Sequence, residues 1–109
     1  MSLYMYQAVY SKDSISGLVK NPQDRTNAIN AVVEANGGIL IGCWMAFGEY
    51  DVVVISEFEN NTDAASVAMA IGASGALGNL KTTVLISMDE AQSAMQKAGT
   101  LTGNYTPPA

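Results

Sequence analysis

The segment 51–58, DVVVISEF, is apolar on both of the faces that an extended chain would present. Successive side chains of a β-strand point to opposite sides of a sheet, so Val52 and Val54 would face one way and Val53 and Ile55 the other. Helices on one side of such a sheet would leave the other side in water, and each exposed large side chain would forgo about 1.5–3 kcal/mol of burial. We therefore expect a sheet that carries helices on one face and meets a second copy of the chain with the other.

Two further segments have the same two-sided character. In the segment 4–10, alternation would place Met5 and Val9 on one face of the sheet. The opposite face would carry Tyr4, Tyr6, Ala8 and Tyr10. In the segment 39–47, strict alternation would place Leu40, Trp44 and Ala46 on one face of the sheet. The opposite face would carry Ile39, Ile41, Cys43 and Met45. Both segments are predicted to be strands of the same sheet.

A first helix is predicted between the strands at 4–10 and 39–47. Asn21 is a suitable N-cap, Pro22 suits the first helical position, and Asp24 can complete the cap. Gly37 and Gly38 are expected to end this helix in the left-handed conformation. The polar segment 11–20 is expected to hold one short helical turn.

The second half of the chain continues the alternation of helix and strand. Thr62 is expected to cap a helix that ends near Gly75 or Gly78, and a fourth strand is expected over 81–87. Ser87 and Glu90 form a capping box for a last helix. The order β-α-β-β-α-β predicts an α+β, ferredoxin-like fold with an antiparallel four-stranded sheet and an extra C-terminal helix. We expect one domain over 1–99 and a tail over 100–109.

Composition excludes several classes of function. Ten acidic residues against five basic ones give a net charge of −5, which disfavours nucleic acid as a partner. The chain has no histidine and one cysteine, Cys43, so zinc, haem and copper sites and His-dependent nucleophiles lose their usual residues. We expect no metal and no cofactor. No basic leader or apolar run of spanning length is present, so we also expect no membrane partner and a cytoplasmic location.

Several motifs together resemble a known family. They are Arg25 in NPQDR, the NGG helix end, FGEYDVVVISEF, GASGALGNLKTTVL and SMDEAQSAM, spread over 4–98. In this combination the chain resembles the GYD domain family of small bacterial proteins, within the dimeric α/β-barrel superfamily. The hairpin at 48–51 also resembles the ligand-binding domain of Lrp/AsnC transcription factors, although this chain lacks their helix-turn-helix. The resemblance implies a homodimer with stacked sheets, and it implies no agreed reaction.

The hairpin GEYD at 48–51 has two interpretations. In the first it is a turn, with Gly48 at a positive φ and Asp51 bonded to a backbone N–H. In the second, Glu49 or Asp51 accepts a proton beside the phenol of Tyr50, which makes these three the candidate catalytic residues.

The remaining candidates are residues that could bind a small molecule. Arg25, the only arginine, either pairs with a surface acid such as Asp24 or binds a carboxylate or phosphate. Trp44 and the tyrosines of the first strand either pack in the core or dimer interface or line an aromatic pocket. The predicted ligand-binding set is Tyr6, Arg25, Trp44, Tyr50 and Asp51.

Three functions fit these features. The first is a homodimeric module that binds a small, partly apolar molecule, in a pocket between sheet and helices or at the dimer interface. The second is a cofactor-independent isomerase or monooxygenase, which the absence of histidine disfavours. The third is an interaction protein without a ligand.

Overall fold

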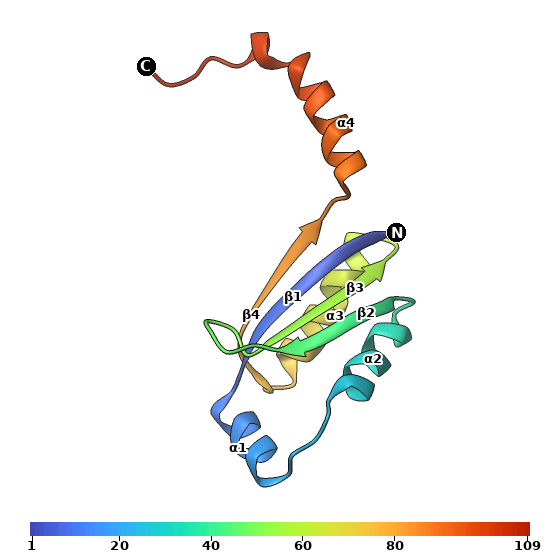
Figure 1. The fold of residues 1–109 in the computed structure, drawn as a ribbon, viewed down its shortest axis with the longest axis vertical. Helices are drawn as coiled ribbons and strands as arrows, with labels where there is room; N and C mark the ends of the chain where they lie inside the picture. The colour runs from blue at the N-terminus through green and yellow to red at the C-terminus, as the bar shows by residue number, and fades with distance from the viewer.

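The computed structural model describes the whole chain, residues 1–109, as a four-stranded sheet with helices on one face (Figure 1). The strands are β1 (Ser2–Tyr10), β2 (Ile39–Met45), β3 (Val52–Phe58) and β4 (Leu77–Leu85). The helices are α1 (Lys12–Lys20), α2 (Thr26–Ala35), α3 (Asn61–Ala73) and α4 (Met88–Gly99), followed by a short 3-10 turn, η1 (Thr102–Asn104). None of these helices is both long enough and apolar enough to cross a lipid bilayer.

All neighbouring strands are antiparallel, and their order in the sheet is β2-β3-β1-β4. This is the ferredoxin-like α+β arrangement that the sequence predicts, with the two central strands adjacent and both helical crossovers on one side. It differs in one element: the segment after β1 forms a nine-residue helix, α1, where one short turn was expected. Ser11 caps α1 by accepting a hydrogen bond from the Ser14 backbone N–H.

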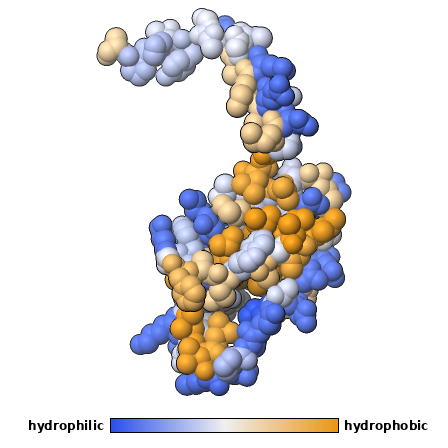
Figure 2. All heavy atoms as spheres, in the orientation of Figure 1, coloured by the Kyte–Doolittle hydropathy of each residue, from blue (hydrophilic) through white to orange (hydrophobic).

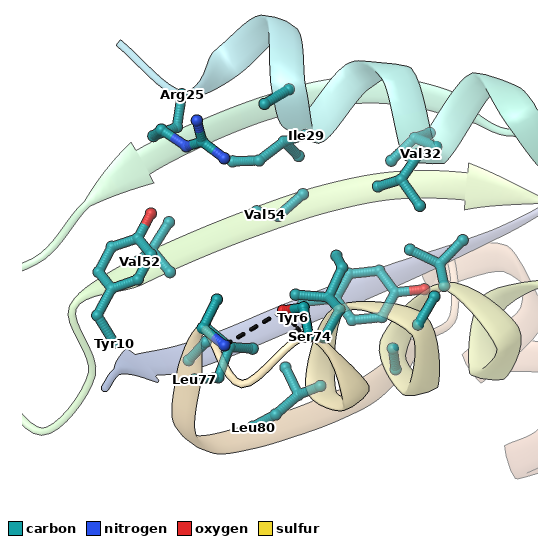
Figure 3. Close-up of a pocket in the computed structure, with 18 residues that line it drawn as sticks. Tyr6, Tyr10, Arg25, Ile29, Val32, Val52, Val54, Ser74, Leu77 and Leu80 are labelled. Carbon is teal, nitrogen blue, oxygen red and sulfur yellow. Dashed lines mark hydrogen bonds between the residues drawn. The ribbon is translucent and has the colours of Figure 1, made fainter. Parts of the chain in front are cut away.

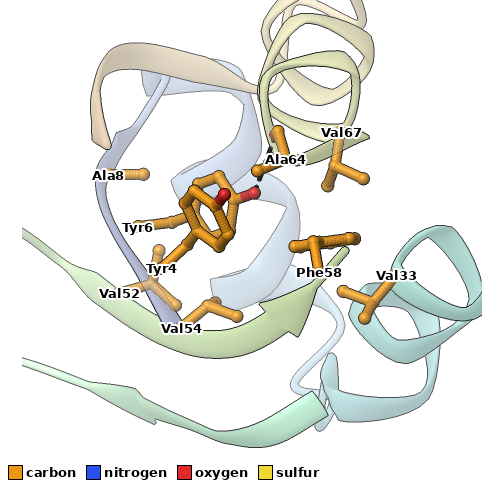
Figure 4. Packing of buried hydrophobic residues seen from close by; sticks show 9 residues of the cluster. All are labelled: Tyr4, Tyr6, Ala8, Val33, Val52, Val54, Phe58, Ala64 and Val67. Carbon is orange, nitrogen blue, oxygen red and sulfur yellow. Dashed lines mark hydrogen bonds between the residues drawn. The ribbon is translucent and has the colours of Figure 1, made fainter. Parts of the chain in front are cut away.

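The core lies between the sheet and helices α2 and α3 (Figure 4). Tyr4 and Tyr6 from β1 meet the ring of Phe58 from β3 edge to face, with centroid distances of 5.9 and 6.5 Å. Val33 from α2 and Val67 from α3 complete the packing around this ring. The predicted alternation is confirmed for both central strands, because the alternate residues Tyr4 to Ala8 and Val52 to Phe58 are the buried ones.

The alternation predicted for β2 is wrong beyond Leu40 because the strand contains a β-bulge. Leu40 pairs with Ser56, but the next pair is Gly42 with Ile55, so one extra residue is inserted into β2. Cys43 therefore lies on the helix-covered face with Leu40, and its Sγ is 3.4 Å from the Thr26 hydroxyl of α2. Trp44 lies on the opposite, open face.

The start of α2 also differs from the prediction. Asn21 does not cap it, because the Asn21 backbone N–H completes α1 by bonding the Gly17 carbonyl. The helix begins after Arg25, whose side chain makes no capping hydrogen bond. At the other end only Gly37 is left-handed, at φ 75°. Gly38 is required for a different reason, since a Cβ there would lie less than 3.0 Å from the ring of Phe58.

The other helix and strand boundaries shift by a few residues. Asn60, rather than the expected Thr62, caps α3 by accepting from the Asp63 N–H. Gly75 ends this region at φ 79°, as expected. β4 begins at Leu77 rather than Lys81, because its first residues pair with the end of β1 across a bulge. Ser87 caps α4 as predicted, by accepting from the Glu90 N–H.

Two apolar surfaces have no cover within the chain. One is the face of the sheet opposite α2 and α3, which faces the viewer in Figure 1 and is largely orange in Figure 2. Trp44, Ile39 and Ile41 on β2 are each more than half exposed there. The other is α4, which extends beyond the sheet and has no buried residue.

Candidate functional site

A cavity of about 300 Å³ lies between the sheet and helices α2 and α3 (Figure 3). Eighteen residues line it and sixteen of them are hydrophobic. β1 and β3 provide the floor, α2 and α3 provide the walls, and Leu77 and Leu80 of β4 close one side. The volume is at the lower end of the range of about 300–1,000 Å³ that is usual for small-molecule pockets.

The cavity exists because packing is uneven along the sheet. Around Phe58, large side chains fill the space between the layers, and Phe58 itself is fully buried. Toward the other end the row of β1 has only Ala8 between Tyr6 and Tyr10, and α3 presents Ala68. These methyl groups cannot fill the space that a tyrosine or phenylalanine would occupy, so a void opens between the layers.

Two polar side chains, those of Tyr10 and Arg25, lie together at one end of the cavity (Figure 3). The Tyr10 hydroxyl makes no hydrogen bond within the chain, and its ring points toward Arg25 in Figure 3. Burial raises the pKa of Tyr10, while the positive charge of Arg25 acts in the opposite direction. Tyr10 is therefore a neutral phenol at physiological pH and is able to donate a hydrogen bond into the cavity.

Arg25 lies exposed at the rim of the cavity. Its Nη1 donates to the side-chain amide oxygen of Gln23 at 2.9 Å, so its hydrogen-bond partner is neutral. Asp24, one acid with which Arg25 could have paired, instead accepts hydrogen bonds from the Thr26 hydroxyl and backbone N–H. Those bonds lower the pKa of Asp24 and keep it ionised. The guanidinium thus retains donors that are free to bind an anion.

Tyr6 lines the middle of the cavity with its ring. Its hydroxyl donates to the Ala64 carbonyl of α3 at 2.7 Å, and burial raises its pKa to about 12. The proton of this phenol is already used within the fold. Tyr6 therefore contributes an apolar surface to the cavity and no free hydrogen-bond donor.

The structure places Asp51 in the frame of the hairpin, outside the cavity lining. One carboxylate oxygen accepts from the Tyr10 N–H at 3.0 Å, and the Asp51 backbone bonds Ala8 on one side and Ala46 on the other. Asp51 thereby holds the end of β1 and orients Tyr10. The bond to a backbone N–H agrees with the turn interpretation, although it reaches β1 rather than the turn itself.

Glu49 and Tyr50 are also absent from the cavity lining. Glu49 is exposed and Tyr50 is half-buried. The positive φ expected at Gly48 is wrong, since only Gly37 and Gly75 have one. The structure therefore does not bring Glu49, Tyr50 and Asp51 together with the cavity.

Trp44 lies on the face of the sheet opposite to Tyr6, because Trp44 pairs with Val53 and Tyr6 pairs with Val54. Its ring lies over Gly42 on the open face, where a Cβ on Gly42 would come within 2.8 Å of it. Trp44 borders a second, less apolar hollow of about 440 Å³ near the start of α2, with seven hydrophobic residues among the twelve that line it. This hollow shares Tyr10, Arg25, Ile29 and Val52 with the main cavity, so Arg25 stands where the two meet.

The predicted ligand-binding set omits two polar residues of the lining, Tyr10 and Ser74, although the aromatic-pocket interpretation included Tyr10 among the tyrosines of the first strand. Alternation with Tyr6 is the signal that places Tyr10 on the cavity side of β1. Ser74 gives no comparable signal, and its hydroxyl is engaged with the Ile71 carbonyl and the Ala76 N–H. No group of three or more Cys, Asp or Glu side chains is arranged to hold a metal ion.

Comparison with known proteins gives a family and a fold. The family model described as the GYD domain matches residues 4–95. No curated protein matches the sequence. The crystal structure of FFRP-DM1 matches with a TM-score of 0.56 at 16% identity, over 79% of this chain and 100% of that one.

Two further structures share the fold at low identity. A transcriptional regulator from Neisseria meningitidis, solved as a complex with L-Met, matches with a TM-score of 0.54 at 10% identity, over 80% of this chain and 51% of that one. A protein from Thermus thermophilus matches with a TM-score of 0.50 at 13% identity, over 80% of this chain and 95% of that one.

Proposed function

This chain belongs to the GYD domain family, and we propose that it is a homodimeric module that binds a small, largely apolar molecule. The observation that carries the proposal is the apolar cavity between the sheet and helices α2 and α3. This cavity of about 300 Å³ has sixteen hydrophobic lining residues, and these side chains lack packing contacts on the side that faces the cavity. A bound molecule would restore those contacts.

Two features favour binding over catalysis. The carboxylates of the hairpin lie outside the cavity lining, and the two acids near the rim, Asp24 and Asp51, already accept hydrogen bonds from Thr26 and from the Tyr10 N–H. The fold is shared with the Neisseria meningitidis regulator that was solved with L-Met, although that likeness does not transfer a ligand to this chain.

The two uncovered apolar surfaces support the homodimer. The open face of the sheet carries Val53 and Ile55 at its centre and Trp44 toward its edge. The helix α4 exposes Met88 and Met95, at 85% and 69%. Exposed apolar area of this kind is typical of a subunit interface, and a second copy supplies a matching sheet face.

Titration with 1-octanol, a neutral apolar probe, tests the binding site. We expect chemical-shift changes in the ¹H–¹⁵N spectrum at cavity residues such as Val52, Val67 and Ile71. The variant Ala68→Phe fills the cavity and should abolish these changes, while Ala65→Phe on the exposed side of α3 should preserve them. Equal binding by both variants, or shifts confined to the open face, would contradict the proposal.

A further inference from the structure

We infer that the ligand of the cavity is an amphipathic monocarboxylate whose apolar chain lies between the helices and whose carboxylate binds Arg25 and Tyr10. The inference rests on the proposed binding function and adds the chemical class of the ligand. Three independent features of the cavity lead to it: its shape and lining, the state of the Arg25 guanidinium, and the state of the Tyr10 hydroxyl.

The lining is strongly asymmetric. The floor and walls from Val54 to Val67 are apolar, and the polar atoms of the one charged lining residue, Arg25, stand at the rim. Such a cavity suits a molecule with a single polar end. At about 30 Å³ for each water-sized group, the volume accommodates roughly ten non-hydrogen atoms, which is the size of an eight-carbon acid.

The sign of the charge at the rim favours an anion. Arg25 is the only arginine in a chain with a net charge of −5, and its bonded partner is the neutral Gln23. A guanidinium binds a carboxylate with two parallel hydrogen bonds, a geometry that a lysine does not offer.

Two negative groups lie near the same rim and define the competing possibility of a cationic ligand. Asp24 is turned to Thr26, and Asp51 is turned to the Tyr10 N–H, so both carboxylates already accept hydrogen bonds within the chain. Arg25 lines the cavity and neither carboxylate does, and the only side-chain partner of Arg25 is the neutral Gln23. This arrangement favours an anionic head group over an ammonium.

Tyr10 supplies the second contact. Its hydroxyl has no partner in the chain and lies on the cavity side, directed toward Arg25. A neutral phenol can donate to one carboxylate oxygen in addition to the two parallel hydrogen bonds from Arg25, because each carboxylate oxygen can accept more than one hydrogen bond. The Asp51 bond to the Tyr10 N–H fixes the backbone from which this phenol projects, which makes Asp51 a positioning residue.

The test compares three eight-carbon probes that differ only in their head group: octanoate, 1-octanol and octylamine. Dissociation constants are measured by calorimetry on the full-length protein at low ionic strength. Octanoate should bind roughly tenfold tighter than 1-octanol, and octylamine should bind more weakly than either. Arg25→Gln should bring octanoate to the affinity of 1-octanol and leave 1-octanol unchanged.

Matched variants distinguish a direct contact between Arg25 and the carboxylate from the effect of the protein's net charge. Lys97→Gln removes the same charge from α4, far from the cavity, and should leave octanoate binding unchanged. Tyr10→Phe should weaken octanoate severalfold, and Arg25→Lys should restore only part of the affinity lost in Arg25→Gln.

The possible results distinguish the inference from the function on which it rests. Equal affinities for octanoate and 1-octanol, an unchanged octanoate affinity in Arg25→Gln, or tightest binding of octylamine would overturn the inference while the binding function stands. If none of the three probes binds, the proposed function itself fails.

Discussion

Gly38 shows at the residue scale how closely the α2–β2 connection approaches the core. The glycine is buried, and three ring atoms of Phe58 occupy the space where a Cβ would be. Phe58 is itself fully buried, so its ring has no room to move aside. The glycine at this position is thus selected by the packing of a distant strand, β3, rather than by its backbone angles.

We expect Gly38→Ala to destabilise the fold by about 1–3 kcal/mol, because the added methyl group overpacks the core. Urea denaturation at a fixed protein concentration measures the change. Gly17→Ala, in the interior of α1 with open space around it, is the matched control and should be neutral or slightly stabilising. If the overlap with the ring is the cause, the cost of Gly38→Ala should shrink in a Phe58→Leu background. A cost unchanged by that background would show that the backbone is responsible.

The ionisation of Tyr6 makes the stability of the fold depend on pH. Its pKa is raised to about 12 in the folded state from 10.0, so the folded state holds the proton more tightly than the unfolded one. The stabilisation is therefore fully present below pH 10 and is lost as the pH rises toward 12. We expect the free energy of unfolding to fall over this interval, and to fall less steeply in Tyr6→Phe.

The same substitution should cost about 1 kcal/mol at pH 7, because it removes the hydrogen bond to the Ala64 carbonyl. Denaturation curves at several pH values give both quantities. Tyr105→Phe, at a side chain that is 70% exposed, should reproduce the wild-type profile. A profile for Tyr6→Phe that parallels the wild type at high pH would rule out Tyr6 as its source.

At the scale of elements, α4 differs from the two helices that cover the sheet. α2 and α3 each bury residues against the sheet, whereas α4 buries none and projects past the end of β4. It is nevertheless well capped at Ser87, and its apolar stripe of Met88, Ala91 and Met95 lies along one side. A capped amphipathic helix without cover in its own subunit is expected to pack against another subunit.

We expect Met95→Glu to weaken the dimer at least tenfold, because it places a charge in the apolar stripe. Ser93→Glu introduces the same charge on the opposite side of α4 and should have little effect. Sedimentation equilibrium measures both dissociation constants. If both variants dimerise like the wild type, α4 takes no part in the interface.

At the scale of the whole molecule, the sheet is covered by helices on only one of its two faces. Helices α2 and α3 cover one face of the four-stranded sheet, and the other face is open and largely apolar (Figure 2). Ile55 lies in a central strand of that open face, between its neighbours Met5 on β1 and Gly42 on β2. It would lie near the middle of an interface formed by two stacked sheets.

We expect Ile55→Lys to yield a folded monomer at micromolar concentration, because burying an unpaired ammonium between two sheets is strongly unfavourable. Light scattering after gel filtration measures the mass, and circular dichroism shows whether the fold persists. Ala65→Lys, on the exposed side of α3, should retain the dimer. A dimer that persists in Ile55→Lys would place the interface elsewhere.

The sequence by itself determined the order of the four strands and of helices α2, α3 and α4, the faces of β1 and β3, and the cap of α4. These features depend on neighbours a few residues apart, through alternation in Tyr4–Tyr10 and a capping box at Ser87. Only the tertiary structure decided which face Cys43 and Trp44 take, where α2 begins, and that Tyr10 and Arg25 share a cavity. A bulge depends on strand pairing, and a void depends on the volumes of side chains that are distant in sequence. Neither quantity is encoded in any short segment of the chain.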